Sequence, residues 1–493
     1  MTEATLADLD VPALLARLGV TPRRITSDSR RVEPGVAFAA YPGTAADGRK
    51  FVPDAIERGA SAVLWESRGF QWDAKWDAPH LGIEGLQQRL GQVADFIYGS
   101  ASRNLWMTGV TGTNGKTSCA HWIAHALDAC GRRAAVLGTL GNGLVGALAP
   151  AHHTTPDVTV LHELLAQFHA AGARAVAMEV SSHGLDQGRV NGATFDVALF
   201  TNLTRDHLDY HKTMAAYGAA KAKLFTWPGL RTAVINADDA FGQSLVDAAR
   251  VRGQRVLTYG FGAADISATP VSLDRNGITL DVVTPAGRAT LRSAVVGAFN
   301  AQNLLGVLGV LLASDVALDD AVAAMTHLPA PAGRMQRLGG DGKPLVVVDF
   351  AHTPDALEKV LTTLRPTVAD GHALVCVFGC GGDRDPGKRP QMGAVAAALA
   401  DRIVVTSDNP RSEDPNAIAN AVVKGIRDAG HRRWSIENDR HAAIAGAIQS
   451  AKEGDVVLVA GKGHETYQER NGQRTPFSDA REAEAALAAW GGA

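Results

Sequence analysis

The stretch Thr108-Gly-Val-Thr-Gly-Thr-Asn-Gly-Lys-Thr-Ser118 decides how the chain around it folds. Before it, the short apolar run Asn104–Met107 predicts a buried strand, and after it apolar residues recur at helical spacing from Ala120 to Leu127. A strand, a glycine-rich turn and a helix form the setting of a phosphate-binding loop. The glycines let backbone N–H groups approach phosphate oxygens, and the helix start adds partial positive charge. The sequence therefore predicts a P-loop.

Two side chains of this loop carry chemistry. Lys116 can reach the β- and γ-phosphates of a nucleotide, and Thr117 places a hydroxyl where a nucleotide-bound Mg²⁺ would sit. The generic loop has glycine six residues before the lysine, whereas this chain has Val110, flanked by Gly109 and Gly112. The alternative is a tight turn with an exposed lysine, but packing alone does not explain Gly-Lys-Thr at a helix start.

Composition and charge narrow the class of protein. The 493 residues are too many for one hydrophobic core and suggest about three domains. A net charge of −3 gives no electrostatic footprint for nucleic acid or an anionic membrane. The four cysteines lack zinc-site spacing and suit a reducing cytosol. The N-terminus has no hydrophobic signal core, and no apolar run is long enough to span a bilayer, so we expect a cytoplasmic protein.

Polar residues follow two apolar strands that come after the P-loop. Glu179 ends the predicted strand 173–180, and His207 follows the predicted strand 195–200. Strands that alternate with helices form parallel sheets, which bind ligands beyond the carboxyl ends of the strands. Both side chains should therefore lie on the phosphate side, where they are natural ligands of Mg²⁺ or of its bound water. The alternative is that they are merely solvated strand ends.

The last part of the chain repeats this alternation. An apolar strand ends in Asp349 and His352, and later strands lead into loops that carry Arg384 and Arg411. Arginine binds carboxylates bidentately, so two arginines at strand tips predict a pocket for an acidic small molecule.

We therefore expect an α/β protein of three domains. Residues 1–102 form a small α/β domain, and residues 103–335 form a P-loop ATPase-type central domain with a parallel sheet and a β-rich insertion at about 255–295. Residues 336–493 form a Rossmann-like C-terminal domain. By residue type alone, the loops Ser27–Arg30 and Thr44–Arg49 are predicted turns, and Lys221 and Lys223 are predicted surface lysines.

Five motifs distributed over nearly the whole chain resemble those of the Mur ligases of peptidoglycan synthesis. They are Thr111–Thr117, Met178–Leu185, Thr201–His211, Asp349–Asp355 and Gly461–Glu465. The valine at position 110 also matches the form that this loop takes in the family. Within the family, Asp408-Asn-Pro-Arg411 resembles the diaminopimelate-recognition motif, whose arginine the lysine-adding relatives usually lack.

The resemblance implies roles in binding ATP and Mg²⁺. The first domain would bind the UDP end of a UDP-linked substrate, and the central domain would bind ATP. Lys221 matches a lysine that is carbamylated in the family, which would replace its ammonium with a carboxylate-like metal ligand. The implied catalytic residues are Lys116, Glu179, His207 and Lys221. The implied metal ligands are Thr117, Glu179, His207 and carbamylated Lys221. The implied ATP-binding residues are Gly112, Thr113, Asn114, Gly115, Lys116, Thr117, Ser118, Asn303, Arg334 and Asp349.

The resemblance also assigns residues to the other two substrates. Ser27, Ser29, Thr44, Ala45 and Ala46 would hold the uridine end of UDP-MurNAc-L-Ala-D-Glu. Thr154, Thr155, Ser181, Gln187 and Arg189 would hold its muramoyl-dipeptide end, and His153 stands where the family often has asparagine. Arg384, Asp408, Asn409, Pro410, Arg411, Gly461 and Glu465 would bind meso-diaminopimelate.

The implied reaction is ATP-dependent amide formation. The D-glutamate side-chain carboxylate would become an acyl phosphate, and the amine of diaminopimelate would then displace phosphate. His207 is one candidate base for the amine. We expect a monomer that closes its domains around the substrates. The alternatives are the lysine-adding ligase, a folylpolyglutamate synthase, which would lack the first domain, and a P-loop switch or motor, which would turn over ATP without these substrates.

Overall fold

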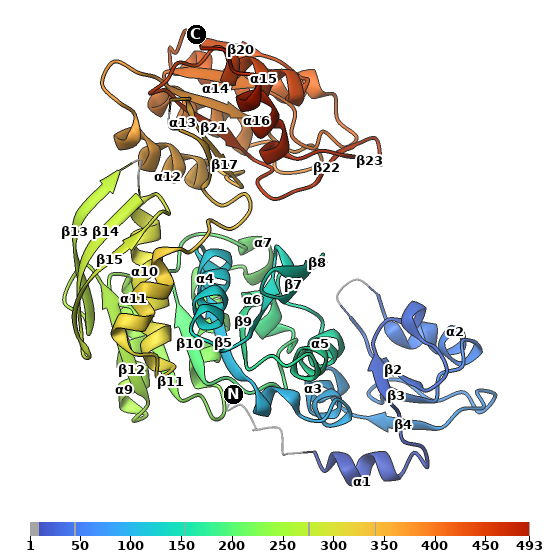
Figure 1. Cartoon of the computed structure of the whole chain (residues 1–493). Helices are drawn as coiled ribbons and strands as arrows, with labels where there is room; N and C mark the ends of the chain where they lie inside the picture. Colours follow the sequence, from blue (N-terminus) through green and yellow to red (C-terminus); the bar gives the residue numbers. More distant parts are fainter. Residues whose placement is uncertain (1–8, 44–45, 152, 275–276, 341, 493) are drawn as a thin grey trace. The chain divides into compact units, whose positions relative to one another are not determined.

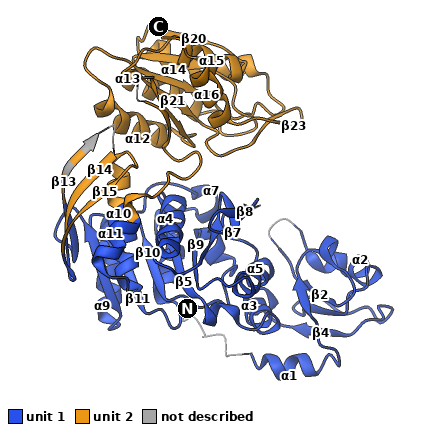
Figure 2. Ribbon diagram, viewed as in Figure 1, with its two compact units in different colours: residues 1–268, 283–287, 303–324 blue, residues 269–282, 288–302, 325–493 orange. Residues whose placement is uncertain are grey.

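The computed structural model describes residues 9–43, 46–151, 153–274, 277–340 and 342–492 (Figure 1). The chain divides into two compact units. One comprises residues 1–268, 283–287 and 303–324, and the other comprises residues 269–282, 288–302 and 325–493 (Figure 2). Among the described helices, none has the length and apolar character needed to cross a membrane.

The first sheet has four parallel strands in the order β1-β2-β3-β4. Its central strand β2 is buried along its whole length, because its sequence Val36-Ala-Phe-Ala-Ala40 has no polar side chain. Helices α1, α2 and α3 accompany the sheet. The bounds are β1 Arg24–Thr26, β2 Val36–Ala40, β3 Ala62–Glu66, β4 His80–Ile83, α1 Val11–Ala16, α2 Val52–Glu57 and α3 Leu86–Ile97.

The second sheet has eleven strands in the order β15-β14-β13-β12-β11-β10-β5-β9-β6-β7-β8. The strands from β12 to β6 in this order are parallel to their neighbours, and β7 and β8 are antiparallel. The bounds are β5 Trp106–Thr111, β6 Ala134–Gly138, β7 Gly141–Leu144, β8 Ala147–Ala149, β9 Ala175–Glu179, β10 Val197–Phe200, β11 Thr232–Asn236, β12 Arg255–Gly260, β13 Ile266–Asp274, β14 Gly277–Thr284 and β15 Gly287–Ser293.

The helices associated with this second sheet include α4, which follows the P-loop directly, and the long apolar α10. Their bounds are α4 Lys116–Ala129, α5 Val158–Ala170, α6 Ser182–Asp186, α7 Leu208–His211, α8 Met214–Ala222, α9 Ala240–Val251, α10 Ala298–Ala313 and α11 Leu318–Thr326.

The third sheet has six strands in the order β16-β17-β21-β18-β19-β20, all parallel except β16. Alternate residues enter two separate cores: Val347, Cys376 and Leu458 pack with α12, α13 and α14, whereas Val346, Val375 and Val457 pack with α15 and α16. Helices on both faces explain why these strands are apolar throughout rather than alternating.

The bounds in this region are β16 Gln336–Gly339, β17 Leu345–Asp349, β18 Leu374–Phe378, β19 Arg402–Val405, β20 Trp434–Ile436, β21 Val456–Ala460, α12 Pro354–Leu364, α13 Lys388–Leu399, α14 Pro415–Asp428, α15 Arg440–Gln449 and α16 Asp479–Ala488. The hairpin β22 Tyr467–Arg470 and β23 Gln473–Pro476 follows β21.

The structure agrees with the predicted α/β class and the β-rich segment near 255–295, and it refines one local prediction. The strand before the P-loop runs on to Thr111. Val110 is therefore a fully buried strand residue, paired with Leu199 on one side and Glu179 on the other, and the loop begins only after it. Helix α5 begins at Val158, with Asp157 as its N-cap.

Candidate active site

The P-loop occupies the turn between β5 and α4, and two of its glycines are required by close contacts. Gly112 has a φ of 149°, and a Cβ there would lie 1.9 Å from the Oγ1 of Thr201. Gly115 has a φ of 85°, and a Cβ there would lie 2.5 Å from the Oδ1 of Asn303. Asn303 lies on α10, far along the sequence, so the fold brings this predicted nucleotide-binding residue against the loop.

The motif that begins at Thr201 holds the P-loop in shape. The Thr113 amide donates to the carbonyl of Asn202 at 2.8 Å, and the Asn114 amide donates to its side-chain oxygen at 3.0 Å. The Thr201 hydroxyl donates to the Asn114 carbonyl at 2.6 Å. The loop is therefore held in place by protein hydrogen bonds.

Lys116 and Lys221 meet at the same loop. The Nζ of Lys116 donates to the carbonyls of Gly112 and Thr113 at 3.0 and 2.9 Å. Lys221 is only 1% exposed, so the prediction of a surface lysine at this position is wrong, whereas Lys223 is exposed and pairs with Asp186 at 3.2 Å. Burial, and secondly the charge of Lys116, lower the pKa of Lys221 well below its usual value.

Glu179 lies at the end of β9 with both carboxylate oxygens engaged. Its Oε2 accepts the Thr117 hydroxyl at 2.8 Å, and its Oε1 accepts the Thr139 amide at 2.7 Å. A carboxylate and a hydroxyl beside a phosphate loop form the hard oxygen donor set that Mg²⁺ prefers, so these residues fit the ion. Within the described part of the chain, no group of three or more His, Cys, Asp or Glu side chains could hold a metal by itself. Phosphate oxygens and water would therefore complete the coordination.

His207 belongs to a cluster of rings that sequence reasoning identified only in part. Its ring lies 4.9 Å from that of His183, which in turn lies 5.4 Å from that of His211 and 4.3 Å from that of Tyr210. Burial is the main cause that lowers the pKa of all three histidines. His207 has a left-handed backbone, with a φ of 53°, at the start of α7. The lowered pKa values favour the neutral rings, which can ligate a metal or accept a proton.

The residues assigned to the muramoyl-dipeptide end come together around Thr155. Its hydroxyl donates to the Glu179 carbonyl at 2.9 Å and accepts from the Ser181 amide at 3.0 Å. Arg189 donates to the Thr155 carbonyl at 3.0 Å and to Gln187 at 2.6 Å. Thr154 contacts Thr139, hydroxyl to hydroxyl, at 3.0 Å. The assigned substrate residues are thus directly connected to the backbone of the candidate metal ligand.

The uridine-end assignments are only partly covered by the structure. Ser27 donates to Asp157 at 3.1 Å, which connects the first sheet to the start of α5. Ser29 is a buried residue of a short 3₁₀ helix, and Ala46 is an exposed loop residue. Thr44 and Ala45 lie outside the described residues.

Asp349 and Arg334 lie together at the end of β17. Asp349 accepts the Met335 amide at 2.8 Å and the Ala351 amide at 2.9 Å, and burial raises its pKa. The Arg334 guanidinium lies 4.8 Å from the centre of the Phe350 ring. The ring of His464 lies 4.9 Å from the same ring, and burial lowers the pKa of this histidine to about 4.

The loops assigned to diaminopimelate form one hydrogen-bonded network. Asn409 donates to Glu465 at 2.8 Å, and fully buried Lys462 donates to both, at 3.0 Å to Asn409 and 2.8 Å to Glu465. The Asp408 carboxylate lies against Gly461, where a Cβ would be 2.6 Å from its Oδ2. The two loops that follow β19 and β21 are therefore joined by hydrogen bonds between their side chains.

Arg411 is held with an unusual backbone. Its φ is 51°, and its Nη1 donates to the Gly382 carbonyl at 2.7 Å. A Cβ on Gly381 would lie 3.1 Å from Arg411 and 3.7 Å from Arg384, so the two predicted carboxylate-binding arginines both lie close to one glycine. The Pro410 carbonyl lies 1.9 Å from where a Cβ on Gly382 would be, so the two loops approach each other too closely for a side chain at position 382.

Sequence reasoning missed Lys462 and the buried pair formed by Arg440 and Asp479, which lies beneath the same loops. Lys462 stands inside the Gly461–Glu465 motif directly after an apolar strand, and this position is a signal for a buried, partnered lysine. Neither Arg440 nor Asp479 carries such a signal, because their contact joins residues 39 positions apart.

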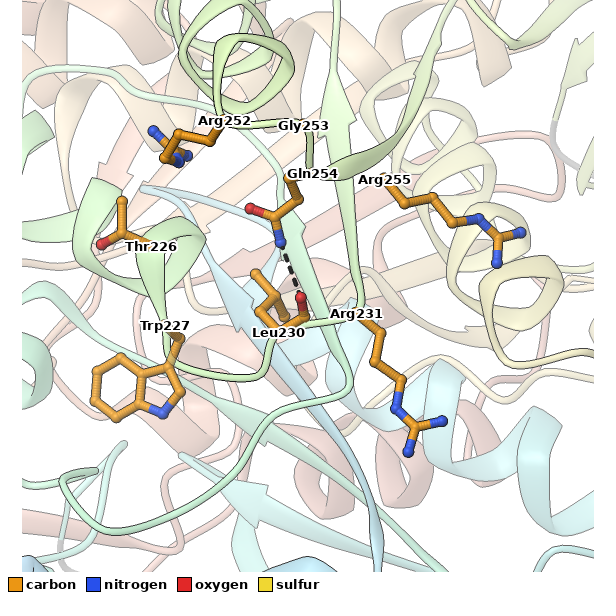
Figure 3. A pocket seen from close by; sticks show the side chains of 8 residues that line it. All are labelled: Thr226, Trp227, Leu230, Arg231, Arg252, Gly253, Gln254 and Arg255. Atoms are coloured by element: carbon orange, nitrogen blue, oxygen red, sulfur yellow. Dashed lines mark hydrogen bonds between the residues drawn. The ribbon is translucent and has the colours of Figure 1, made fainter.

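A surface pocket of about 380 Å³ lies elsewhere, between Trp227, Leu230 and the segment Arg252–Arg255 (Figure 3). Arg231, which lines it, immediately precedes β11, and Arg255 begins β12. The pocket is therefore at the amino ends of parallel strands, whereas the P-loop follows the carboxyl end of β5. It contains none of the assigned site residues, and Arg231 already pairs with Asp196 at 3.0 Å.

Comparison with known proteins places this geometry in a family. Three family profiles match the chain: the Mur ligase family catalytic domain over residues 23–98, the Mur ligase middle domain over 110–311, and the Mur ligase glutamate ligase domain over 333–463. Among solved structures, one of a UDP-N-acetylmuramoyl-L-alanyl-D-glutamate–2,6-diaminopimelate ligase is similar with a TM-score of 0.71 at 39% identity, and the alignment covers 95% of each chain. A folylpolyglutamate synthase from Mycobacterium tuberculosis complexed with ADP shares the fold over 75% of this chain and 90% of its own, with a TM-score of 0.60 at 22% identity.

Two curated relatives cover almost the entire length. An enzyme from Chromobacterium violaceum is 54% identical over 99% of this chain and 98% of its own, and one from Pseudomonas aeruginosa is 52% identical over 95% of each. Both are named UDP-N-acetylmuramoyl-L-alanyl-D-glutamate–2,6-diaminopimelate ligase. The predicted α/β fold and the predicted family are thus confirmed, and the chain belongs to the Mur ligase family.

Proposed function

We propose that this protein is an ATP-dependent ligase that joins meso-diaminopimelate to the D-glutamate side-chain carboxylate of UDP-MurNAc-L-Ala-D-Glu, producing ADP and phosphate. The observation that carries the proposal is the 54% identity over 99% of the chain to a relative with that name, because it includes the P-loop and both loops assigned to diaminopimelate. The joined network of Asn409, Lys462 and Glu465 supports it, since it forms a polar site suited to a zwitterionic ligand.

The chemistry requires activation before the amide can form. A carboxylate oxygen attacks the γ-phosphorus and ADP leaves, which gives an acyl phosphate. The amine nitrogen then attacks the acyl carbon, the C–O bond breaks, and phosphate leaves while the amine loses a proton. Lys116 and the backbone amides at the start of α4 offset the charge on the transferred oxygens.

We assign the Mg²⁺ ligands to Thr117, Glu179, His207 and carbamylated Lys221. The ion would neutralise charge on the phosphates when bound. Carbamylation forms an N–C bond between the Lys221 amine and CO₂ and releases a proton from the nitrogen, so it needs the neutral amine. Burial and the charge of Lys116 lower the pKa of Lys221, and this favours the neutral amine.

The remaining assignments follow the family resemblance. Asn303, Arg334 and Asp349 are assigned to the nucleotide. Ser27, Ser29, Ala46, Thr154, Thr155, Ser181, Gln187 and Arg189 are assigned to the UDP-linked substrate. Arg384, Asp408, Asn409, Pro410, Arg411, Gly461 and Glu465 are assigned to diaminopimelate. We further propose domains at 1–102, 103–335 and 336–493, and a monomer that works in the cytoplasm, where ATP is available.

The proposal is most specific about the amino acid that is added. Diaminopimelate carries a distal carboxylate that lysine lacks, and Arg411 would pair with it. With lysine bound, the guanidinium would lose that partner, and such a mismatch can discriminate by factors on the order of 10⁴.

The test is phosphate release by the purified full chain with ATP, Mg²⁺ and UDP-MurNAc-L-Ala-D-Glu, comparing meso-diaminopimelate with L-lysine. Wild type and Arg411→Ala are compared with Arg432→Ala, a matched change at an exposed arginine. We expect turnover with diaminopimelate only, lost in Arg411→Ala and kept in Arg432→Ala. Equal turnover with lysine would reject the acceptor assignment, and ATP hydrolysis indifferent to both amino acids would reject the ligase.

A further inference from the structure

Beneath the diaminopimelate loops lies a fully buried ion pair. The Nε and Nη2 of Arg440 donate to the two carboxylate oxygens of Asp479, each at 2.7 Å, and both side chains are completely shielded from solvent. Arg440 is the first residue of α15 and Asp479 is the first residue of α16, two helices that lie side by side (Figure 1). The bidentate contact therefore fixes the starts of the two helices against each other.

The same guanidinium also contacts the end of β21 and the loop that follows β19. Its Nη1 donates to the Ser407 carbonyl at 3.2 Å, and its Nη2 donates to the Ala460 carbonyl at 3.0 Å. Ser407 immediately precedes Asp408, and Ala460 immediately precedes Gly461. One planar group thus sets the distance between the points at which both diaminopimelate loops leave the sheet.

Local helix energetics do not explain an arginine at this place. A cation in the first turn of a helix opposes the helix dipole, whereas Asp479 in the first turn of α16 agrees with it. A buried ion pair is in addition often no more stable than apolar residues of similar volume. The distinctive property of this pair is its rigid geometry, since a guanidinium donates in fixed directions.

We propose that Arg440, oriented by Asp479, is a positioning residue that holds the loops 407–411 and 461–465 at the spacing that diaminopimelate binding requires. It touches the loop backbones rather than the ligand. The identity of the ligand rests on the proposed function, whereas the control of loop spacing does not.

The first experiment measures steady-state kinetics of Arg440→Lys and Asp479→Asn in the full chain. Lysine at position 440 keeps the positive charge but cannot make the two parallel hydrogen bonds of the guanidinium. Asparagine at position 479 keeps the shape of aspartate but replaces one carboxylate oxygen that accepts from Arg440 with an NH₂ group. We expect the KM for diaminopimelate to rise roughly 10- to 100-fold, while the KM values for ATP and UDP-MurNAc-L-Ala-D-Glu stay unchanged. Ile444→Ala is the matched control, because Ile444 is a fully buried residue of the same helix whose side chain packs in the apolar core.

The control separates positioning from stability. Ile444→Ala should lower Tm without changing any of the three KM values. If it raised the diaminopimelate KM as much as Arg440→Lys does, or if all three KM values rose together in the Arg440 variant, the pair would be merely structural and the proposal would be overturned.

The second experiment needs no substrate. Amide hydrogen exchange should become faster at 407–411 and 461–465 in Arg440→Lys and Asp479→Asn, with the P-loop segment 112–118 unchanged. Unaltered exchange in both loops would overturn the positioning role even if the enzyme adds diaminopimelate. If the wild type does not turn over diaminopimelate but the two variants still show faster exchange in both loops, the positioning role stands and the proposed function is rejected. If Arg440→Lys does not fold, exchange in Asp479→Asn decides whether the pair positions the loops. If neither single variant folds, the double variant Arg440→Met/Asp479→Leu is measured instead, because it removes the hydrogen bonds of the pair while keeping an apolar contact between the two helices.

Discussion

The amino groups of Lys116 and Lys221 donate to one acceptor, the carbonyl oxygen of Gly112, at 3.0 and 2.7 Å. Two cations that share a carbonyl repel each other, and this repulsion adds to burial in lowering the pKa of Lys221. A bound γ-phosphate would draw Lys116 away from this carbonyl. The state of Lys221 and the occupancy of the P-loop are thereby expected to influence each other.

Replacing Lys221 tests whether it is modified. Under ¹³C-labelled bicarbonate, the wild type should show a carbamate carbon resonance that is absent from Lys221→Arg, because arginine has no neutral amine at accessible pH. Lys223→Arg changes an exposed neighbour and should retain the resonance. We expect a loss of activity of at least about 100-fold in Lys221→Arg, consistent with a lost metal ligand. A carbamate signal that survives in Lys221→Arg would place the modification elsewhere.

Substituting Gly138 tests the position of Glu179 without touching its charge. A Cβ at residue 138 would lie 2.3 Å from the Oε1 of Glu179, and the carboxylate cannot move away without breaking its bond to Thr117 or Thr139. Gly138→Ala should therefore lower kcat by roughly 10- to 100-fold while the protein stays folded. Gly446→Ala is the matched control, because a Cβ there meets no atom within 4 Å. Equal activity in the two variants would mean that the position of Glu179 is not critical.

Lys462 is expected to contribute both to the stability of the fold and to the binding of diaminopimelate. Its side chain is fully buried, and removing one member of a buried pair leaves Glu465 and Asn409 without their shared donor. Lys462→Met should lower the free energy of unfolding by about 3 kcal/mol and raise the KM for diaminopimelate. Urea unfolding measures the first quantity. Lys452→Met, at an exposed lysine, should change stability by less than about 0.5 kcal/mol.

The contact between His441 and Glu482 predicts a pH dependence of stability. The Nδ1 of His441 lies 2.6 Å from Glu482, and this hydrogen bond raises the pKa of the histidine. A raised histidine pKa contributes stability that is fully present below the unfolded value of about 6.5 and is lost as the pH rises through the folded value. The Tm difference between wild type and His441→Gln should therefore be larger at about pH 5.5 than at about pH 8.5. A difference that grows with pH would contradict this assignment.

The parts of the site that sequence predicted are those built from short motifs. Glu179 stands at the end of one apolar strand, and Lys116 and Thr117 begin the helix that follows another. Chain periodicity locates such boundaries even when the strand bounds are displaced by a few residues. Asp349 was found for the same reason at the end of β17.

The parts that sequence missed depend on contacts between distant segments. Lys221 is predicted from its helix to be a surface residue, and only the approach of α8 to the P-loop buries it. The pairing of Arg440 with Asp479 likewise exists only because two helices pack together. Short strands such as β1 and β20, of three residues each, are too brief for periodicity to reveal.

The left-handed backbone of Arg411 constrains how acceptor choice can change during evolution. Position 411 must satisfy both a φ of 51° and the recognition of a carboxylate. Glycine and asparagine adopt that φ readily, whereas β-branched side chains resist it. A lineage that turns to an acceptor without the distal carboxylate is therefore expected to pass through glycine or asparagine at this position, or else to rebuild the turn, rather than to substitute valine or isoleucine directly.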